Sequence, residues 1–193
     1  LGDPNNQDNM IGVFLEPDLP TGTWGIRLHG VLAPNGRFHA WIERDDLAPS
    51  RFAAAQQDTS HTIGSISCGQ ETIVVGSYDA HKVETPLSFF SRAGPTREGR
   101  EKPEVSAPGH AVLAAHSRTG TGVVRKSGTS MAAPAVTGLT ALVLAEARVR
   151  SRDLSSAEVR SLLIQAARKN PPDGAGWDPR YGHGRASASA AVA

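Results

Sequence analysis

A chain of 193 residues, 39% of them hydrophobic, is long enough to bury one core and part of a second. Its 20 basic and 19 acidic residues are mixed along the sequence, which argues against nucleic acid or an anionic membrane as a partner. We find no apolar run that approaches a membrane span, so no membrane partner is expected. Specificity is therefore expected to come from a local site.

Residues 1–57 have the pattern of β-structure. Residues 24–28 and 38–42 alternate large apolar with smaller or polar residues, and Pro34-Asn35-Gly36 lies between them. Asn-Gly favours a tight hairpin turn because both residues tolerate positive φ. Residues 10–15 are a candidate third strand. Since three strands enclose little core, we expect part of a β-sandwich whose other strands lie upstream.

Residues 58–193 have the pattern of an α/β domain. Residues 72–76, Thr-Ile-Val-Val-Gly, form a continuous β-branched run, typical of a strand in a parallel sheet covered on both faces. Short strand patterns follow at residues 87–90, 111–113 and 123–124. We therefore expect a second domain that spans residues 58–193.

Two helices are predicted in this second domain. Residues 131–150 are apolar around almost the whole helix, which predicts a central buried helix with Leu142 in the core and Pro134 in the first turn. Residues 155–158, Ser-Ser-Ala-Glu, have the capping-box pattern and precede apolar residues at helical spacing. They predict a surface helix with one buried face.

Ser130 lies between a glycine-containing turn and the start of the long helix, in the segment Ser-Gly-Thr-Ser-Met-Ala-Ala-Pro of residues 127–134. The first N–H groups of a helix lack intrahelical acceptors and lie at the positive end of its dipole. An oxyanion that forms beside Ser130 would find donors there, so this serine could supply the attacking Oγ and one donor. Taken alone, the position is equally that of a helix-capping serine.

The segment 127–134 closely resembles the nucleophile motif of the subtilisin-like serine proteases. Four further segments resemble elements of that family in the family's order: residues 73–77, 87–95, 102–109 and 181–185. Ala135 stands where the family commonly has a histidine, but that histidine is not a member of the catalytic triad. Five ordered matches make the helix-cap interpretation insufficient.

The resemblance implies an α/β fold: the C-terminal part of a subtilisin-like parallel-sheet sandwich, preceded by a partial β-sandwich insertion. It implies a serine endopeptidase that acts on protein or peptide substrates, with Ser130 as nucleophile and Ser130 and Thr129 supporting the oxyanion. Ser91, Gly94 and Gly128 are expected to line the substrate cleft. An extracellular or cell-envelope location is favoured.

No organic cofactor is implied. Many relatives bind calcium, but the sequence has no Asp-rich loop with a recognisable ligand spacing, so no metal ligands are assigned.

The other triad members have no counterpart in the sequence. In the family the Asp lies in Asp-x-Gly, the His in His-Gly-Thr and an oxyanion Asn in Ala-Ala-Gly-Asn, and none of these motifs occurs. We expect a missing N-terminal portion of the same protease to supply all three residues, and this chain alone to be inactive. His29, His110 and His116 are weak substitutes because they lack the motif context.

Two alternatives compete with this interpretation, and the first fails on its motif. An α/β-hydrolase would require Gly-x-Ser-x-Gly, but residue 132 is alanine. A pseudoprotease or a β-sandwich binding module could use the subtilisin-like part only as a scaffold. The intact Gly-Thr-Ser-Met segment argues against a decayed site.

Overall fold

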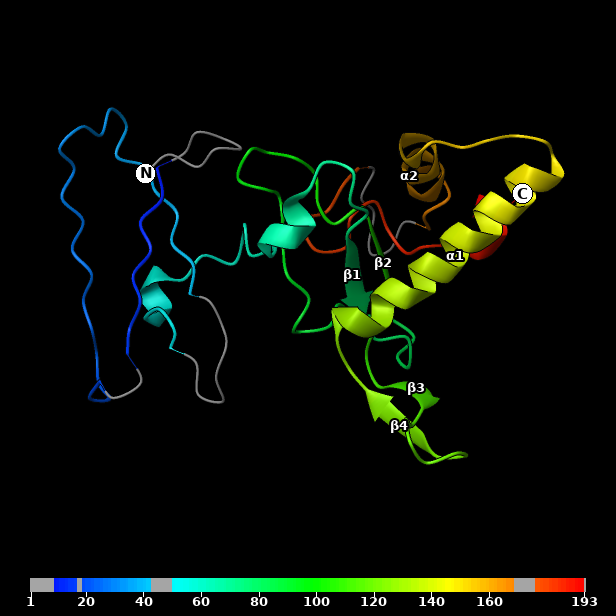
Figure 1. The fold of residues 1–193 in the computed structure, drawn as a ribbon, viewed down its shortest axis with the longest axis horizontal. Helices are drawn as coiled ribbons and strands as arrows, with labels where there is room; N and C mark the ends of the chain where they lie inside the picture. The colour runs from blue at the N-terminus through cyan, green and yellow to red at the C-terminus, as the bar shows by residue number, and fades with distance from the viewer. Residues whose placement is uncertain (1–8, 17–18, 43–49, 169–175, 193) are drawn as a thin grey trace. The chain divides into compact units, whose positions relative to one another are not determined.

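The computed structural model describes residues 9–16, 19–42, 50–168 and 176–192, which fall into two units that divide between Arg51 and Phe52 (Figure 1). The predicted boundary, after residue 57, lies slightly further along the chain. The second unit contains all the helices and strands assigned in the described residues.

The hairpin predicted in the first unit is only half right. Gly36 has a φ of 63°, and the Arg37 N–H donates to the Asn35 side chain at 3.0 Å, so the chain bends at the predicted position. However, residues 10–15, 24–28 and 38–42 contain no assigned strand, so the strand predictions are wrong. Trp24 and Phe38 are 56% and 68% exposed, and a ladder without a covered apolar face is marginal in water.

A two-stranded parallel sheet lies at the centre of the second unit. Strands β1 (Val75–Tyr78) and β2 (Val105–Pro108) pair from Val75 opposite Val105 to Tyr78 opposite Pro108. The run at residues 72–76 thus predicts the strand but places it too early. Residues 87–90 form no strand, since Leu87 makes only an isolated antiparallel bridge to Tyr78.

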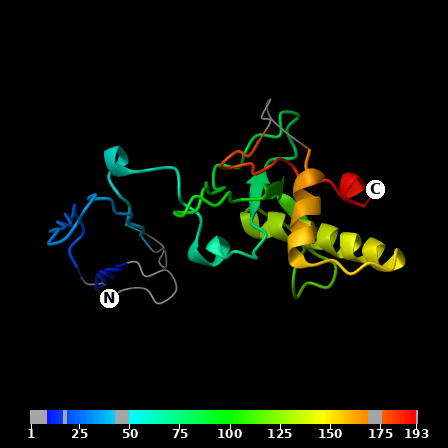
Figure 2. The ribbon, with the colours of Figure 1, turned by 90° about the horizontal axis from the view of Figure 1, so that it is seen from above.

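Helix α1 (Thr129–Val149) packs against both parallel strands, and the later helices α2 (Ser156–Gln165) and α3 (Ala188–Ala191) pack against α1 (Figures 1 and 2). The hydrophobic core lies where these elements meet. Its largest members come from β2, α1 and α2: Val105, Val136, Leu139, Val143, Val159 and Leu163. Strands β3 (Val112–Ala115) and β4 (Val123–Lys126) confirm the two short strands predicted there and pair as a separate antiparallel hairpin between β2 and α1 in the chain.

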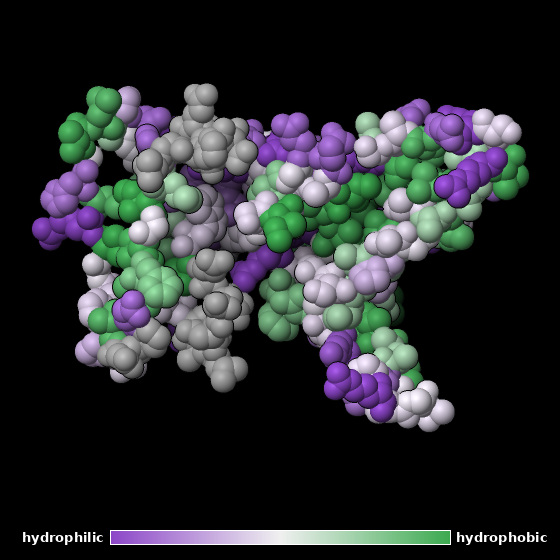
Figure 3. Space-filling view, in the orientation of Figure 1, coloured by the Kyte–Doolittle hydropathy of each residue, from purple (hydrophilic) through white to green (hydrophobic). Residues whose placement is uncertain are grey.

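Helix α1 is buried along one face only, contrary to the prediction of all-round burial. Val136, Leu139 and Val143 face the core, whereas Leu142 is 55% exposed, so its assignment to the core is wrong. Pro134 is also inside the helix and not in its first turn, because the helix begins at Thr129. Apolar side chains are open to solvent beside the helix in the space-filling view (Figure 3).

The expectation of no membrane-length apolar segment needs correction as well. Helix α1 has 21 residues and a window of mean hydropathy 1.4, so it could cross a membrane by length and composition. A core helix of a soluble fold passes the same test, and α1 packs on a sheet, so the property is weak evidence for a membrane.

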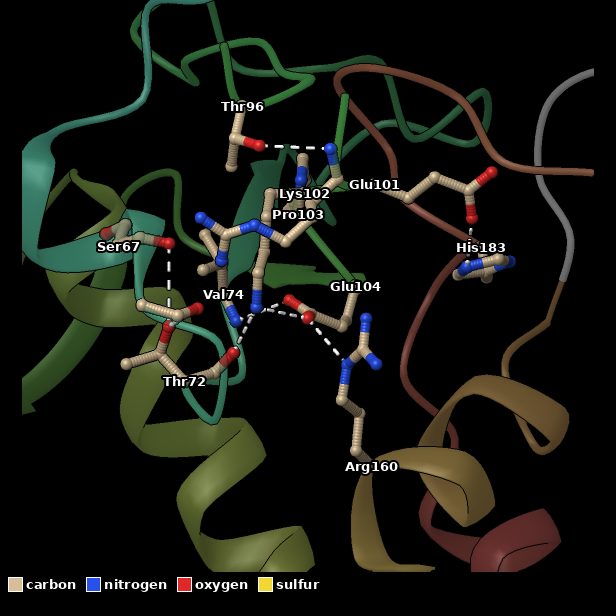
Figure 4. Close-up of polar contacts among 12 residues, drawn as sticks. Ser67, Thr72, Val74, Thr96, Glu101, Lys102, Pro103, Glu104, Arg160 and His183 are labelled. Carbon is tan, nitrogen blue, oxygen red and sulfur yellow. Dashed lines mark hydrogen bonds and ion pairs between the residues drawn. The ribbon is translucent and has the colours of Figure 1, made fainter. Parts of the chain in front are cut away.

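A buried carboxylate connects the sheet to α2. The Glu104 side chain is fully buried, and its Oε1 accepts from Lys102 Nζ at 2.6 Å and from Arg160 Nε at 2.8 Å (Figure 4). Its Oε2 accepts the Val74 N–H at 2.7 Å, while Lys102, itself 1% exposed, also donates to the Thr72 carbonyl. Every charged group is therefore hydrogen-bonded, which a buried ion pair requires.

Helix α2 begins with the predicted capping box. The Ser155 Oγ accepts the Glu158 N–H at 3.3 Å, and the Glu158 carboxylate accepts the Ser155 N–H at 2.8 Å. The hydrogen bonds from the Ser155 backbone and hydroxyl hold the pKa of Glu158 below its usual value, because they favour the charged form. Val159 and Leu163 are buried on one face, so the surface-helix prediction is confirmed.

We predict that Glu104→Gln destabilises the second unit by about 3–5 kcal/mol, since it leaves Lys102 buried without its counter-charge. The matched control is Glu98→Gln, which removes an exposed ion pair to Arg100 and should cost about 0–1 kcal/mol. Urea unfolding of both variants measures the difference. Equal effects would show that the burial of the carboxylate does not matter.

We also predict a pH-dependent contribution from the capping box. Because folding lowers the pKa of Glu158, its stabilisation is present above the unfolded pKa and is lost as pH falls through the folded pKa. The gap in unfolding midpoint between the wild type and Glu158→Gln should therefore narrow on acidification. A gap that stays constant as the pH falls through the pKa of Glu158 would contradict the stabilising role of its carboxylate in the capping box.

Candidate active site

Ser130 is the second residue of α1, and its side chain is exposed. The Met131 N–H donates to the Gly128 carbonyl at 2.9 Å, which closes the first turn of the helix. Within the described part of the chain, neither the Ser130 N–H nor its hydroxyl has a hydrogen-bond partner. A solvent-accessible hydroxyl and an uncommitted N–H thus lie together at the positive end of the helix dipole.

The turn before Ser130 is fixed to the loop that follows β2. The Gly128 N–H donates to the Gly109 carbonyl at 2.8 Å, and the Ala111 N–H donates to the Ser127 Oγ at 2.8 Å. The Gly109 N–H in turn donates to the Tyr78 carbonyl at the end of β1. These hydrogen bonds place Ser130 at the carboxyl end of the parallel strands, where α/β proteins commonly bind ligands.

Gly109 permits the close approach on which this arrangement depends. A Cβ atom at this position would lie 2.3 Å from the Ser77 Oγ and 2.7 Å from the Gly128 carbonyl oxygen. Neither distance is possible, so a larger residue would push the nucleophile turn away from β1. The sequence places Gly109 only within a segment that resembles the family, and no sequence pattern singles out Ser77.

Ser91 and Gly94, two of the expected cleft residues, are both buried. The Ser91 Oγ accepts the Ser77 N–H at 3.0 Å, which places Ser91 behind the sheet edge that carries the nucleophile turn. A Cβ on Gly94 would meet the Lys102 carbonyl, so Gly94 is also a close-packing position. Thr129 and Gly128 flank Ser130 and are half-buried. The cleft and oxyanion roles of these residues stay predictions.

Two histidines, His110 and His116, lie on either side of β3. His110 stacks on Phe90 with ring centroids 6.3 Å apart, and His116 lies beyond the end of β3. No histidine in the described ranges is hydrogen-bonded to Ser130. Burial raises the pKa of the Tyr78 hydroxyl, opposed by the charge of Arg185, so Tyr78 is neutral near pH 7.

Over the ranges that the structure describes, no group of three or more His, Cys, Asp or Glu side chains is placed to hold a metal ion. Calcium binding therefore remains an expectation from the family resemblance, without assigned ligands.

We predict that Gly109→Ala destabilises the second unit by about 1–3 kcal/mol, because the added methyl overpacks against Ser77 and Gly128. Gly138→Ala is the matched control. Gly138 lies in α1, and a methyl group added there would meet no atom within 4 Å, so alanine should stabilise the helix by about 0.5–1 kcal/mol. Chemical unfolding tests the pair, and a stabilised Gly109→Ala protein would rule out the close approach.

Comparisons with known proteins agree with this geometry. A sequence model of the subtilase family matches residues 43–184. Serine protease AprX from Bacillus subtilis is 33% identical over 150 residues, which cover 69% of this chain and 32% of that protein.

Solved structures of proteases and a macrocyclase are also similar to this chain. The CspB protease of Clostridium perfringens matches with a TM-score of 0.64 and 32% identity, over 71% of this chain and 29% of that one. The PatG macrocyclase, solved in complex with peptide, matches with a TM-score of 0.50 and 30% identity, over 62% of this chain and 34% of that one. This chain thus spans about a third of the length of these three relatives. The family match covers most of the chain, which belongs to the subtilase family of serine proteases.

Proposed function

We propose that this chain supplies the nucleophile and one oxyanion donor of a serine endopeptidase. The observation that carries the proposal is the pairing of an exposed Ser130 hydroxyl with an uncommitted Ser130 N–H at the start of α1. A polypeptide segment upstream of this chain supplies the general base His, the Asp that orients it and the oxyanion Asn.

The reaction is acyl transfer. The upstream His takes the Ser130 proton as Oγ attacks the scissile carbonyl carbon. The carbonyl oxygen, on which negative charge develops, accepts a hydrogen bond from the Ser130 N–H. Collapse of the tetrahedral intermediate breaks the peptide bond, and the His returns its proton to the leaving amine. Water, activated by the same His, then attacks the acyl-enzyme and releases the second product. The Ser127 and Gly109 contacts hold the turn during these steps.

The uncovered face of α1 supports a packing partner from the same protein. Ile73, Val75 and Ala133 line an apolar depression between β1 and α1, and Leu142 is exposed on the helix. Covering these residues would bury apolar surface, which favours association. The relatives are about three times as long as the matched region, so they contain enough further chain to provide such a cover.

Protein or peptide substrates follow from the protease family, and PatG, a relative with bound peptide, is consistent with them. A pseudoprotease remains the second candidate, favoured only if the upstream segment lacks the Asp, His and Asn. An extracellular or cell-envelope location stays a prediction.

We predict that a phosphonylating active-site probe labels the full-length polypeptide at Ser130 and labels this chain alone at least about 10⁴-fold more slowly, because the hydroxyl without its base stays protonated. Ser130→Ala in both proteins is the control for site-specific labelling. Rapid labelling of the short chain that disappears in its Ser130→Ala form would contradict the need for an upstream base. A full-length protein that neither reacts nor cleaves an unfolded protein substrate would favour the pseudoprotease.

A further inference from the structure

One stretch of an otherwise balanced chain contains basic residues but no acidic ones. The protein as a whole carries 20 basic and 19 acidic residues, yet no Asp or Glu occurs between Glu104 and Glu146. Arg118, Arg125 and Lys126 all fall within that stretch. The distribution therefore differs locally from the mixed charge of the rest of the sequence.

The three cations lie on the β3–β4 hairpin. Lys126 and Arg125 are on β4, opposite Val112 and Leu113 of β3, and Arg118 is in the connecting turn. All three side chains are exposed, and the hairpin projects from the second unit with hydrophilic side chains on its surface (Figures 1 and 3). None of the three forms an ion pair with a residue that the structure describes, and Arg125 donates only to the Ala111 carbonyl at 3.3 Å. Their charges are thus open to a ligand.

The hairpin leads directly into the nucleophile turn. Lys126 ends β4, and only Ser127, Gly128 and Thr129 separate it from Ser130. A chain of four residues spans at most about 14 Å, so the Lys126 backbone lies within that distance of the nucleophile. An extended substrate rises by about 3.3 Å per residue, so its side chains within about four residues of the scissile bond can come near the cations.

The acidic groups of the loop after β1 leave this charge uncompensated. The loop after β1 approaches the hairpin base, where the His81 ring contacts the Ala111 carbonyl at 3.4 Å. Asp79 in that loop is 8% exposed and accepts the His81 N–H, so its carboxylate is turned into the fold. Lys82 and Glu84 on the same loop offset one another in charge.

We propose that the β3–β4 hairpin makes this site selective for substrates with an acidic side chain within about four residues of the scissile bond, on the side that faces the hairpin. The inference rests on the proposed endopeptidase function and adds the substrate class. An exposed ion pair is weak, so each acidic side chain should raise kcat/KM by a factor of about two to five, and this factor should fall as salt screens the charges.

The test uses the full-length polypeptide and peptides that differ only by Glu, Gln or Lys at one position, taken in turn on both sides of a fixed cleavage bond. The expected order of kcat/KM at the selective position is Glu, then Gln, then Lys. Arg125→Glu combined with Lys126→Glu should reverse that order while the Gln peptide is still cleaved, since neither residue is in the catalytic machinery.

Arg148→Glu is the matched control. Arg148 lies in the last turn of α1, about 27 Å along the helix from Ser130. Reversing its charge should therefore leave the order of kcat/KM among the three peptides unchanged. Cleavage of the Gln peptide with no preference among the three peptides would overturn the inference and keep the proposed function. Failure to cleave any peptide would overturn both. An unchanged order in the double variant, together with weakened binding to anionic vesicles, would identify the hairpin as a membrane contact instead and overturn the inference.

Discussion

The buried Glu104 carboxylate connects segments that lie far apart in the sequence. The carboxylate accepts hydrogen bonds from the backbone N–H just before β1, from the Lys102 ammonium beside β2 and from the Arg160 guanidinium of α2 (Figure 4). The backbone carbonyl of Glu104 also accepts the His183 N–H from the C-terminal segment. A sheet of two strands has too few ladder hydrogen bonds to set the position of these segments by itself. In this unit, charge-assisted hydrogen bonds do so at the amino end of the sheet.

The carboxyl end of the same two strands lies beside Ser130, the proposed nucleophile. There the constraint is contact between backbones: Gly109 lies against Ser77 and Gly128 so closely that no side chain fits, and the turn before Ser130 is held by that contact. The short strands therefore connect the Glu104 hydrogen bonds at their amino ends to the closely packed turn at their carboxyl ends. The parallel arrangement is what allows β1 and β2 to end together beside the start of α1.

Local patterns predicted what local interactions determine. The Ser155 and Glu158 capping box, the bend at Gly36 and the short strands β3 and β4 all depend on residues close in sequence, and each lies where the sequence predicted it. The strands at residues 24–28 and 38–42 and the burial of Leu142 failed because they depend on a covering surface that these residues cannot specify. Ser130 was identified through its motif, whereas the role of Ser77 required knowing which segments meet in space.

The proposed oxyanion donor and the proposed nucleophile belong to one residue at the start of one helix. Any displacement of α1 carries the Ser130 hydroxyl and N–H together, so their mutual geometry is independent of what the rest of the protein does. Association with the proposed upstream segment then has to align the general base and the oxyanion Asn with this one residue, which limits the orientational entropy lost in assembling the site. On that proposal, the part of the site that this chain supplies is preorganised by the start of α1.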